Sequence, residues 1–162
     1  EVADLCQQSG LPWLRYTQVS KPSNAQIPSF IDSQQHSRRV LLVDAMGVLF
    51  DFYRRADVVF VGGSLADKGG HNPLEPATLG KPVLMGPNCF NFTQVCDQLE
   101  QVQALKVTTS AHLLKDMTAL LIDPLLRESM GAAGAQLVNQ QKGALARNLL
   151  FIEAVFEQAL KE

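Results

Sequence analysis

Short, unbroken runs of apolar residues alternate with longer amphipathic stretches along most of this chain. This alternation restricts the fold more than any other feature. Strands are expected at four places: 39–44 (RVLLVD), 58–61 (VVFV), 82–85 (PVLM) and 105–108 (LKVT). A strand that lacks polar alternation is buried on both faces, which is typical of a parallel sheet with helices on each side. The sequence therefore predicts an α/β fold with a Rossmann-like, doubly wound parallel sheet.

The rest of the chain divides into helices, one weaker strand and one long loop. Helices are expected at 2–8, 46–55, 72–79 and 91–101. The weaker strand is expected at 13–17, and the Ser-, Gln- and Pro-rich residues 18–37 are expected to form a loop. From residue 113 the pattern is purely helical, with a new helix that opens at Pro124 and is interrupted at Gly143.

Composition excludes several classes of protein. The chain has 162 residues, of which 46% are hydrophobic and 19% charged, and a net charge of -2. These values predict one globular domain, or one and a fraction, and no broad basic face for nucleic acid. Three separated cysteines favour a reducing compartment over a disulfide framework. No run approaches the roughly 18 apolar residues of a membrane span, and no signal peptide is visible. Because the chain opens with Glu1, it is expected to be part of something longer.

The glycine-rich stretch 61–76 (VGGSLADKGGHNPLEP) is the strongest candidate for a ligand site. It joins the end of a strand to the start of a helix, where ligands of such sheets bind. Glycine lets a ligand approach the backbone, and a helix start offers free N–H groups to a phosphate. Residues that could contribute are Ser64, Gly69, Gly70, His71, Asn72 and Glu75, the last as an acceptor for ribose hydroxyls.

A purely structural interpretation of the same stretch stays open. Asn72 and Glu75 have the spacing of a capping box, with Pro73 at the first helical position. Pro76 has no N–H to bond to the Asn72 carbonyl, so it would free that acceptor or move the start of the helix to Pro76. The four glycines of the loop exceed what a cap requires, and this excess favours a ligand.

A second candidate is the turn at 43–50 (VDAMGVLF), which also follows a predicted strand. It looks similar to the first motif of haloacid dehalogenase-type phosphatases, but the required second Asp is replaced by Met46, which neither donates nor titrates. Two interpretations remain. Met46 and Gly47 open a turn against which a base can lie, or Met46 merely fills a gap. Asp44 is expected to orient the turn by accepting backbone N–H groups. No cysteine has metal-ligand spacing to a histidine.

The stretch from Val61 to Phe92 (VGGSLADKGGHNPLEPATLGKPVLMGPNCFNF) closely resembles the 3-deoxy-D-manno-octulosonic acid (Kdo) transferases of lipopolysaccharide biosynthesis. The resemblance covers about 39–150 and is tightest in GGHNPLEP and GPNCFNF. It implies that residues 1–162 are the carboxyl-terminal, donor-binding domain of a GT-B glycosyltransferase, without its first βα units and without the amino-terminal acceptor domain.

The resemblance also implies a donor and its contacts. The donor would be CMP-Kdo, with no other cofactor and no metal. Its CMP portion would be contacted by Met46, Gly47, Val48, Asn72, Pro73, Leu74 and Glu75. The acceptor would be a lipid A precursor, and the anomeric carbon would invert. The general base would belong to the absent domain, so no catalytic residue lies in this chain and the chain alone is expected to be inactive.

Location and departures from the family follow from the same resemblance. The full-length protein would act at the cytoplasmic face of the bacterial inner membrane, with membrane contact only through the missing amino-terminal part, and this chain would be soluble. Val48 stands where the family usually has Glu, so only its backbone contact carries over. Asn88 stands where the family often has His.

Two alternatives to a Kdo transferase stay open at this stage. One is a GT-B transferase that uses a UDP sugar, since the pattern from Glu75 to Val83 (EPxxxGxPV) is shared more widely among nucleotide-sugar enzymes. The other is a nucleotide-binding or docking domain without a reaction of its own.

Overall fold

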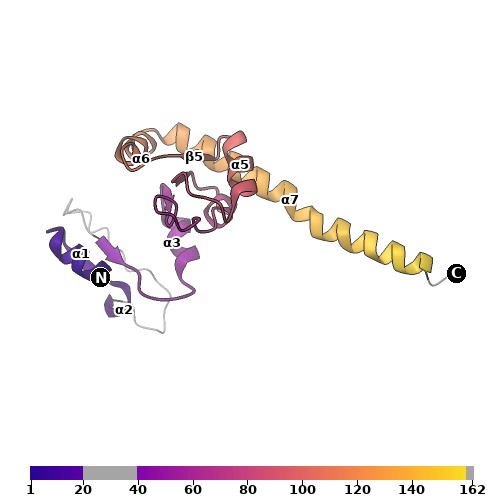
Figure 1. Ribbon diagram of the computed structural model, residues 1–162, viewed down its shortest axis with the longest axis horizontal. Coiled ribbons are helices and arrows are strands. Elements are labelled where there is room, and N and C mark those ends of the chain that lie inside the picture. The colour runs from indigo at the N-terminus through magenta and orange to yellow at the C-terminus, as the bar shows by residue number, and fades with distance from the viewer. Residues whose placement is uncertain (20–39, 160–162) are drawn as a thin grey trace. The chain divides into compact units, whose positions relative to one another are not determined.

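The computed structural model describes residues 1–19 and 40–159, and beyond Gln141 it describes the course of the chain and the side chain of Ile152. The chain forms two compact units, Glu1–Phe52 and Tyr53–Glu162, and each is described by itself. Figure 1 shows their elements along the chain. Most of the loop predicted at 18–37, with His36, lies outside the described residues.

Unit 1 contains two parallel strands and short helices. Its elements are α1 (Val2–Gln8), β1 (Trp13–Arg15), α2 (Tyr16–Val19), β2 (Val40–Leu42) and the first half of α3 (Leu49–Arg55). Trp13 lies opposite Val40 in the pairing of β1 with β2. The predicted helix 2–8 is confirmed. The predicted strand 13–17 is too long by two residues, because the chain turns into α2 at Tyr16.

Unit 2 contains a three-stranded parallel sheet of order β3-β4-β5. Its elements are β3 (Val59–Val61), α4 (Leu74–Thr78), β4 (Val83–Met85), α5 (Thr93–Gln101), β5 (Leu105–Val107), α6 (Leu113–Ile122) and α7 (Pro124–Ala159). Val59 pairs with Val83, and Val83 pairs with Leu105. All three strands run in the same direction, so their carboxyl ends, and the loops that follow them, meet at one edge of the sheet.

Both faces of this sheet are covered, as the unbroken apolar strands predict. One face packs in a core with α4 and α5: Val59, Val61, Ala77, Val83, Met85, Cys96, Leu99 and Leu105. The other face turns Leu84 toward Leu120 of α6 and Met130 of α7. The prediction of an α/β fold with a parallel sheet between helices is therefore confirmed.

Helix starts and one helix break differ from the predictions. The helix predicted from Met46 begins at Leu49, because Gly47 has a positive φ of 80° that cannot continue a helix. Gly143 does not interrupt the last helix, since α7 is continuous from Pro124 to Ala159 (Figure 1). A glycine inside a helix costs only about 1 kcal/mol relative to alanine, which is too little to end it.

Helix α7 crosses the end of α4 at very close range. A Cβ on Gly131 of α7 would overlap the carbonyl oxygen of Gly80, which follows α4 with a positive φ of 68°. One turn further, a Cβ on Gly134 would lie 3.4 Å from the Ala77 side chain. Small residues on both helices therefore let α7 support α4, whose amino-terminal end leads into the candidate site.

Candidate nucleotide site at the carboxyl edge of the sheet

The loop that follows β3, residues 62–73, is closed on itself by backbone hydrogen bonds. The N–H of Gly70 donates to the carbonyl oxygen of Gly63 at 3.1 Å, and that of His71 donates to the carbonyl oxygen of Gly62 at 3.1 Å. Gly63 and Gly70 have positive φ angles of 74° and 71°. Residues with side chains rarely adopt such angles, so these glycines are required by the shape of the loop itself.

Ser64 is fully buried inside this loop. Its hydroxyl donates to the carbonyl oxygen of Val61 at 2.6 Å and accepts from the N–H of Gly86 at 2.8 Å. Its carbonyl oxygen accepts from the N–H of Asn88 at 2.9 Å. Ser64, which the sequence suggested as an additional ligand contact, thus ties the loop after β3 to the loop after β4 and presents no exposed atom to a ligand.

The loop after β4, residues 86–92, interlocks with the glycine-rich loop. The N–H of Asn91 donates to the carbonyl oxygen of Gly69 at 3.2 Å, and its side-chain amide donates to that of Lys68 at 3.2 Å. A Cβ on Gly70 would overlap the terminal methyl group of Met85. Residues 62–73 and 86–92 therefore form one body, here named the paired loops.

The first turn of α4 begins at Leu74, two residues later than predicted. The side-chain oxygen of Asn72 accepts from the N–H of Leu74 at 3.0 Å. In a capping box this oxygen would instead meet the N–H of Glu75. Asn72 therefore caps the turn without closing the box, and the helix begins at Leu74 and not at Pro76, where one of the two open interpretations placed it.

This helix start offers a ligand fewer donors than the sequence predicts. The first N–H groups of a helix normally lack partners, but Pro73 and Pro76 have no N–H, and that of Leu74 is bonded to Asn72. In the described part of the chain, Glu75 carries the one N–H among residues 73–76 that has no protein acceptor. The expectation of several free N–H groups is therefore wrong.

Glu75 is half-buried in this first turn and keeps part of its side chain accessible. The pKa of the Tyr53 hydroxyl is raised, first by burial and then by the negative charge of Glu75. The two side chains are therefore neighbours within unit 2. A half-buried carboxylate beside the paired loops is suited to accept hydrogen bonds from ligand hydroxyls. His71, which precedes Asn72, is exposed.

The turn after β2 belongs to unit 1. Met46 is 98% exposed, and a Cβ on Gly47 would have no atom within 4 Å. Asp44 anchors the turn, since its carboxylate accepts from the N–H of Thr17 at 3.1 Å and from the Thr17 hydroxyl at 2.9 Å. The N–H bond contributes most to holding the pKa of Asp44 below its ordinary value. The expected structural role of Asp44 is confirmed.

The residues predicted to contact CMP thus fall in both units. Unit 1 holds Met46, Gly47 and Val48, and unit 2 holds Asn72, Pro73, Leu74 and Glu75. Within unit 2, the structure brings the last four together with Gly69, Gly70 and His71 at the paired loops. That the two groups meet around one ligand stays a prediction.

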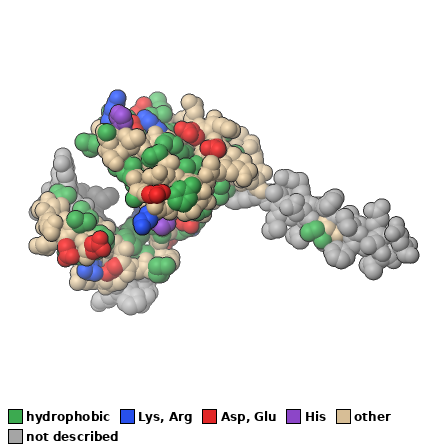
Figure 2. Space-filling view, viewed as in Figure 1, with side chains coloured by type: hydrophobic (Ala, Val, Ile, Leu, Met, Phe, Trp, Pro, Cys, Tyr) green, Lys and Arg blue, Asp and Glu red, His purple; other side chains and the backbone are tan. Residues whose placement is uncertain are grey.

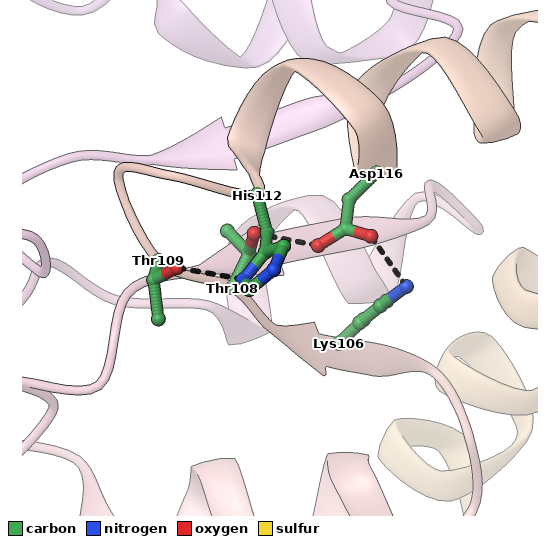
Figure 3. Close-up of polar contacts among 5 residues, drawn as sticks. All are labelled: Lys106, Thr108, Thr109, His112 and Asp116. Atoms are coloured by element: carbon green, nitrogen blue, oxygen red, sulfur yellow. Dashed lines mark hydrogen bonds and ion pairs between the residues drawn. The ribbon is translucent and has the colours of Figure 1, made fainter.

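The structure also shows a polar cluster at the carboxyl end of β5 that the sequence did not predict (Figure 3). The carboxylate of Asp116, on α6, accepts from the ammonium group of Lys106 and from the hydroxyl of Thr108, both at 2.6 Å. Lys106 and then Thr108 hold the pKa of Asp116 below its ordinary value. Close to Asp116, the hydroxyl oxygen of Thr109 lies 3.0 Å from the Nδ1 atom of His112. Lys106 lies on β5, and Thr108 directly follows the end of that strand. Asp116 binds both, which fastens α6 to β5.

The cysteines and the surface add no second site. Cys96 is buried and Cys89 is half-buried. Burial, followed by the influence of Cys89, raises the pKa of Cys96 to about 12. Among residues 1–19 and 40–159, no three His, Cys, Asp or Glu side chains are placed to hold a metal ion. A hollow of about 420 Å³ beside β5 is lined by none of the predicted contacts.

Figure 2 shows acidic, basic and hydrophobic side chains interspersed on the visible face, without a large area of one charge. Within the part of the chain that the structure describes, no helix combines the length and the apolar character needed to cross a bilayer.

Comparison with known proteins identifies relatives by sequence that share one name. No family model matches the chain. The 3-deoxy-D-manno-octulosonic acid transferase of Haemophilus influenzae is 35% identical over 97% of this chain and 34% of its own length. That of Bordetella pertussis is 36% identical over 70% of this chain and 27% of its own length. The chain therefore spans about a third of the length of these relatives or less.

One solved structure matches over most of the chain. It is the C-terminal CMP-Kdo binding domain of WaaA from Acinetobacter baumannii, with a TM-score of 0.71, 31% sequence identity, and coverage of 85% of this chain and 66% of that one. By fold, this chain is a Rossmann-like α/β domain of the kind that forms the carboxyl-terminal half of a GT-B glycosyltransferase. By sequence and fold together, it belongs to the 3-deoxy-D-manno-octulosonic acid transferases and corresponds to their C-terminal domain.

Proposed function

We propose that this chain is the donor-binding domain of a Kdo transferase and that it holds the CMP portion of CMP-Kdo. The observation that carries the proposal is the body of paired loops with Glu75 at its exit, at the carboxyl edge of the sheet where such folds bind ligands. The relatives named as Kdo transferases, and the Acinetobacter domain named as CMP-Kdo binding, support the choice of donor.

Each part of the nucleotide has a proposed contact. Glu75 accepts hydrogen bonds from the ribose hydroxyls, because its carboxylate is partly accessible. The exposed turn at Met46, Gly47 and Val48 provides a surface for the base. The phosphate lies against the paired loops, next to the N–H of Glu75.

The proposed reaction is transfer of Kdo to a lipid A precursor with inversion at the anomeric carbon. A carboxylate of the amino-terminal domain would deprotonate the acceptor hydroxyl, at the cytoplasmic face of the bacterial inner membrane. This domain would stabilise the negative charge that develops on the CMP phosphate as the bond to Kdo breaks. We accordingly expect the chain without that amino-terminal domain to bind donor and to lack transferase activity.

Calorimetric titration with CMP tests the assignment of Glu75. Glu75→Ala should weaken CMP binding by about 1–3 kcal/mol, since ribose hydroxyls lose a charged acceptor. Glu128→Ala, which changes an exposed carboxylate on α7, is the matched control and should leave affinity unchanged. Equal CMP affinity of Glu75→Ala and the parent would remove the proposed ribose contact.

The same titration separates the donor classes. Preference for CMP over UMP and UDP supports the proposal, whereas preference for UDP would favour a transferase of UDP sugars. A full-length protein that binds CMP but transfers nothing from CMP-Kdo to a lipid A precursor would favour a domain without a reaction of its own.

A further inference from the structure

The start of α4 offers a bound phosphate few backbone donors, which leaves room for a side chain to supply part of its binding. The N–H groups of Gly70 and His71 are used to close the loop. Prolines occupy positions 73 and 76 at the start of α4, where free N–H groups normally serve an anion. The N–H of Glu75 is the donor that remains there among the described residues.

Three asparagines lie in the paired loops, and two of them are engaged within the protein. The side-chain oxygen of Asn72 accepts from the N–H of Leu74 at 3.0 Å. The side-chain amide of Asn91 donates to the carbonyl oxygen of Lys68 at 3.2 Å. The third, Asn88, is half-buried, and among the described residues the structure gives its side chain no hydrogen-bond partner.

The backbone of Asn88 is nevertheless fixed in place. Its N–H donates to the carbonyl oxygen of buried Ser64 at 2.9 Å. Its own carbonyl oxygen lies 3.4 Å from the position that a Cβ on Gly70 would take. An asparagine whose backbone is fixed and whose side-chain amide has no partner can donate two hydrogen bonds to a ligand without adding charge. Asn88 therefore carries two side-chain donors without a partner among the described residues, on a backbone that lies beside Gly70.

We propose that Asn88 is a phosphate-binding residue of the donor site and that its side-chain amide donates to a phosphate oxygen of the CMP group. The inference rests on the proposed function and adds to it a contact specific to the phosphate. It predicts that Asn88 distinguishes CMP from cytidine, which lacks the phosphate.

The test measures the affinities of CMP and cytidine for the parent chain, Asn88→Ala, Asn88→Asp and Asn91→Ala, together with thermal unfolding of each. Asn88→Ala should lower CMP affinity roughly tenfold, the effect of a lost hydrogen bond to a charged group, and leave cytidine affinity and the unfolding midpoint unchanged. Asn88→Asp should lower CMP affinity further, because a carboxylate would face the phosphate.

Asn91→Ala is the matched control, because its amide serves the loops and not the ligand. It should lower the unfolding midpoint and weaken CMP and cytidine by the same factor. The inference is overturned if Asn88→Ala binds CMP as tightly as the parent, or if cytidine affinity falls as much as CMP affinity. If the parent binds neither CMP nor cytidine, the proposed function fails and this inference fails with it.

Discussion

The turn after β2 and the paired loops both place glycine at the end of a strand, but for different reasons. At Gly47, in unit 1, a Cβ would meet nothing, so only the positive φ of 80° calls for glycine. At Gly86, in unit 2, φ is not positive, yet a Cβ would overlap the backbone of Ser64 and Leu65. Gly47 is thus required by its own backbone angle, whereas Gly86 is required by a segment that lies 22 residues away in sequence.

The largest loss of stability is expected at Gly86, where the backbones of the two paired loops are in direct contact. Gly86→Ala should lower the free energy of unfolding by about 3 kcal/mol, because the new methyl group meets main-chain atoms of Ser64 that have no rotamer to change. Urea unfolding followed by circular dichroism measures the loss. Gly47→Ala is the matched control; it adds strain at a positive φ without a clash and should cost about 1 kcal/mol. Equal losses at the two positions would remove the distinction between the turns.

A smaller effect is expected at the buried hydroxyl that joins the paired loops. Ser64→Ala should cost about 1–3 kcal/mol, because the N–H of Gly86 loses its acceptor in a place that water does not reach. Ser129→Ala, at an exposed position of α7, is the control and should change little. Faster amide exchange at Gly86 in Ser64→Ala would show that the lost stability comes from this hydrogen bond. Unchanged exchange at Gly86 would contradict the role of Ser64 in joining the two loops.

The smallest effect is expected from a lowering of the pH, which should weaken the turn after β2 before it weakens the paired loops. Asp44, whose folded pKa is depressed below 3.8, stabilises the turn after β2 fully above pH 3.8, and this contribution is lost as the pH falls through the lower folded value. The bonds that join the paired loops come from backbone, hydroxyl and amide groups, which do not titrate there. The protection of the Thr17 amide, which is its exchange rate relative to the intrinsic rate at the same pH, should therefore fall below pH 3.8 before that of the Gly86 amide does. In Asp44→Asn, Thr17 should already exchange faster at neutral pH. A parallel loss of protection at Thr17 and Gly86 in the parent would show that both regions depend on acid groups.

The strands of unit 2 could be predicted from sequence, since β3, β4 and β5 lie within one residue of the predicted limits. Burial on both faces leaves a continuous hydrophobic signal that needs no knowledge of the partner strand. The starts of α3 and α4 could not be placed, because they depend on the sign of φ at Gly47 and on which turn two prolines permit.

The joining of the paired loops could not be predicted either. A serine in a glycine-rich stretch looks the same whether it meets a ligand or, as Ser64 does, the backbone of Gly86. Three asparagines at one edge likewise look equivalent until the structure shows that Asn72 and Asn91 are engaged. Sequence therefore indicates where ligand chemistry gathers, while long-range contacts decide which side chains are left to perform it.

The crossing of α7 over Gly80 has a practical consequence for anyone who divides this protein into pieces. The opening turns of this last helix, as far as Val138, supply side chains to the same interior as the strands. These turns are part of the hydrophobic core of unit 2, so a truncation that removes them would expose the sheet. Position 131 accepts no side chain larger than hydrogen, so any piece of this protein that keeps α4 must also keep α7 with glycine at that position.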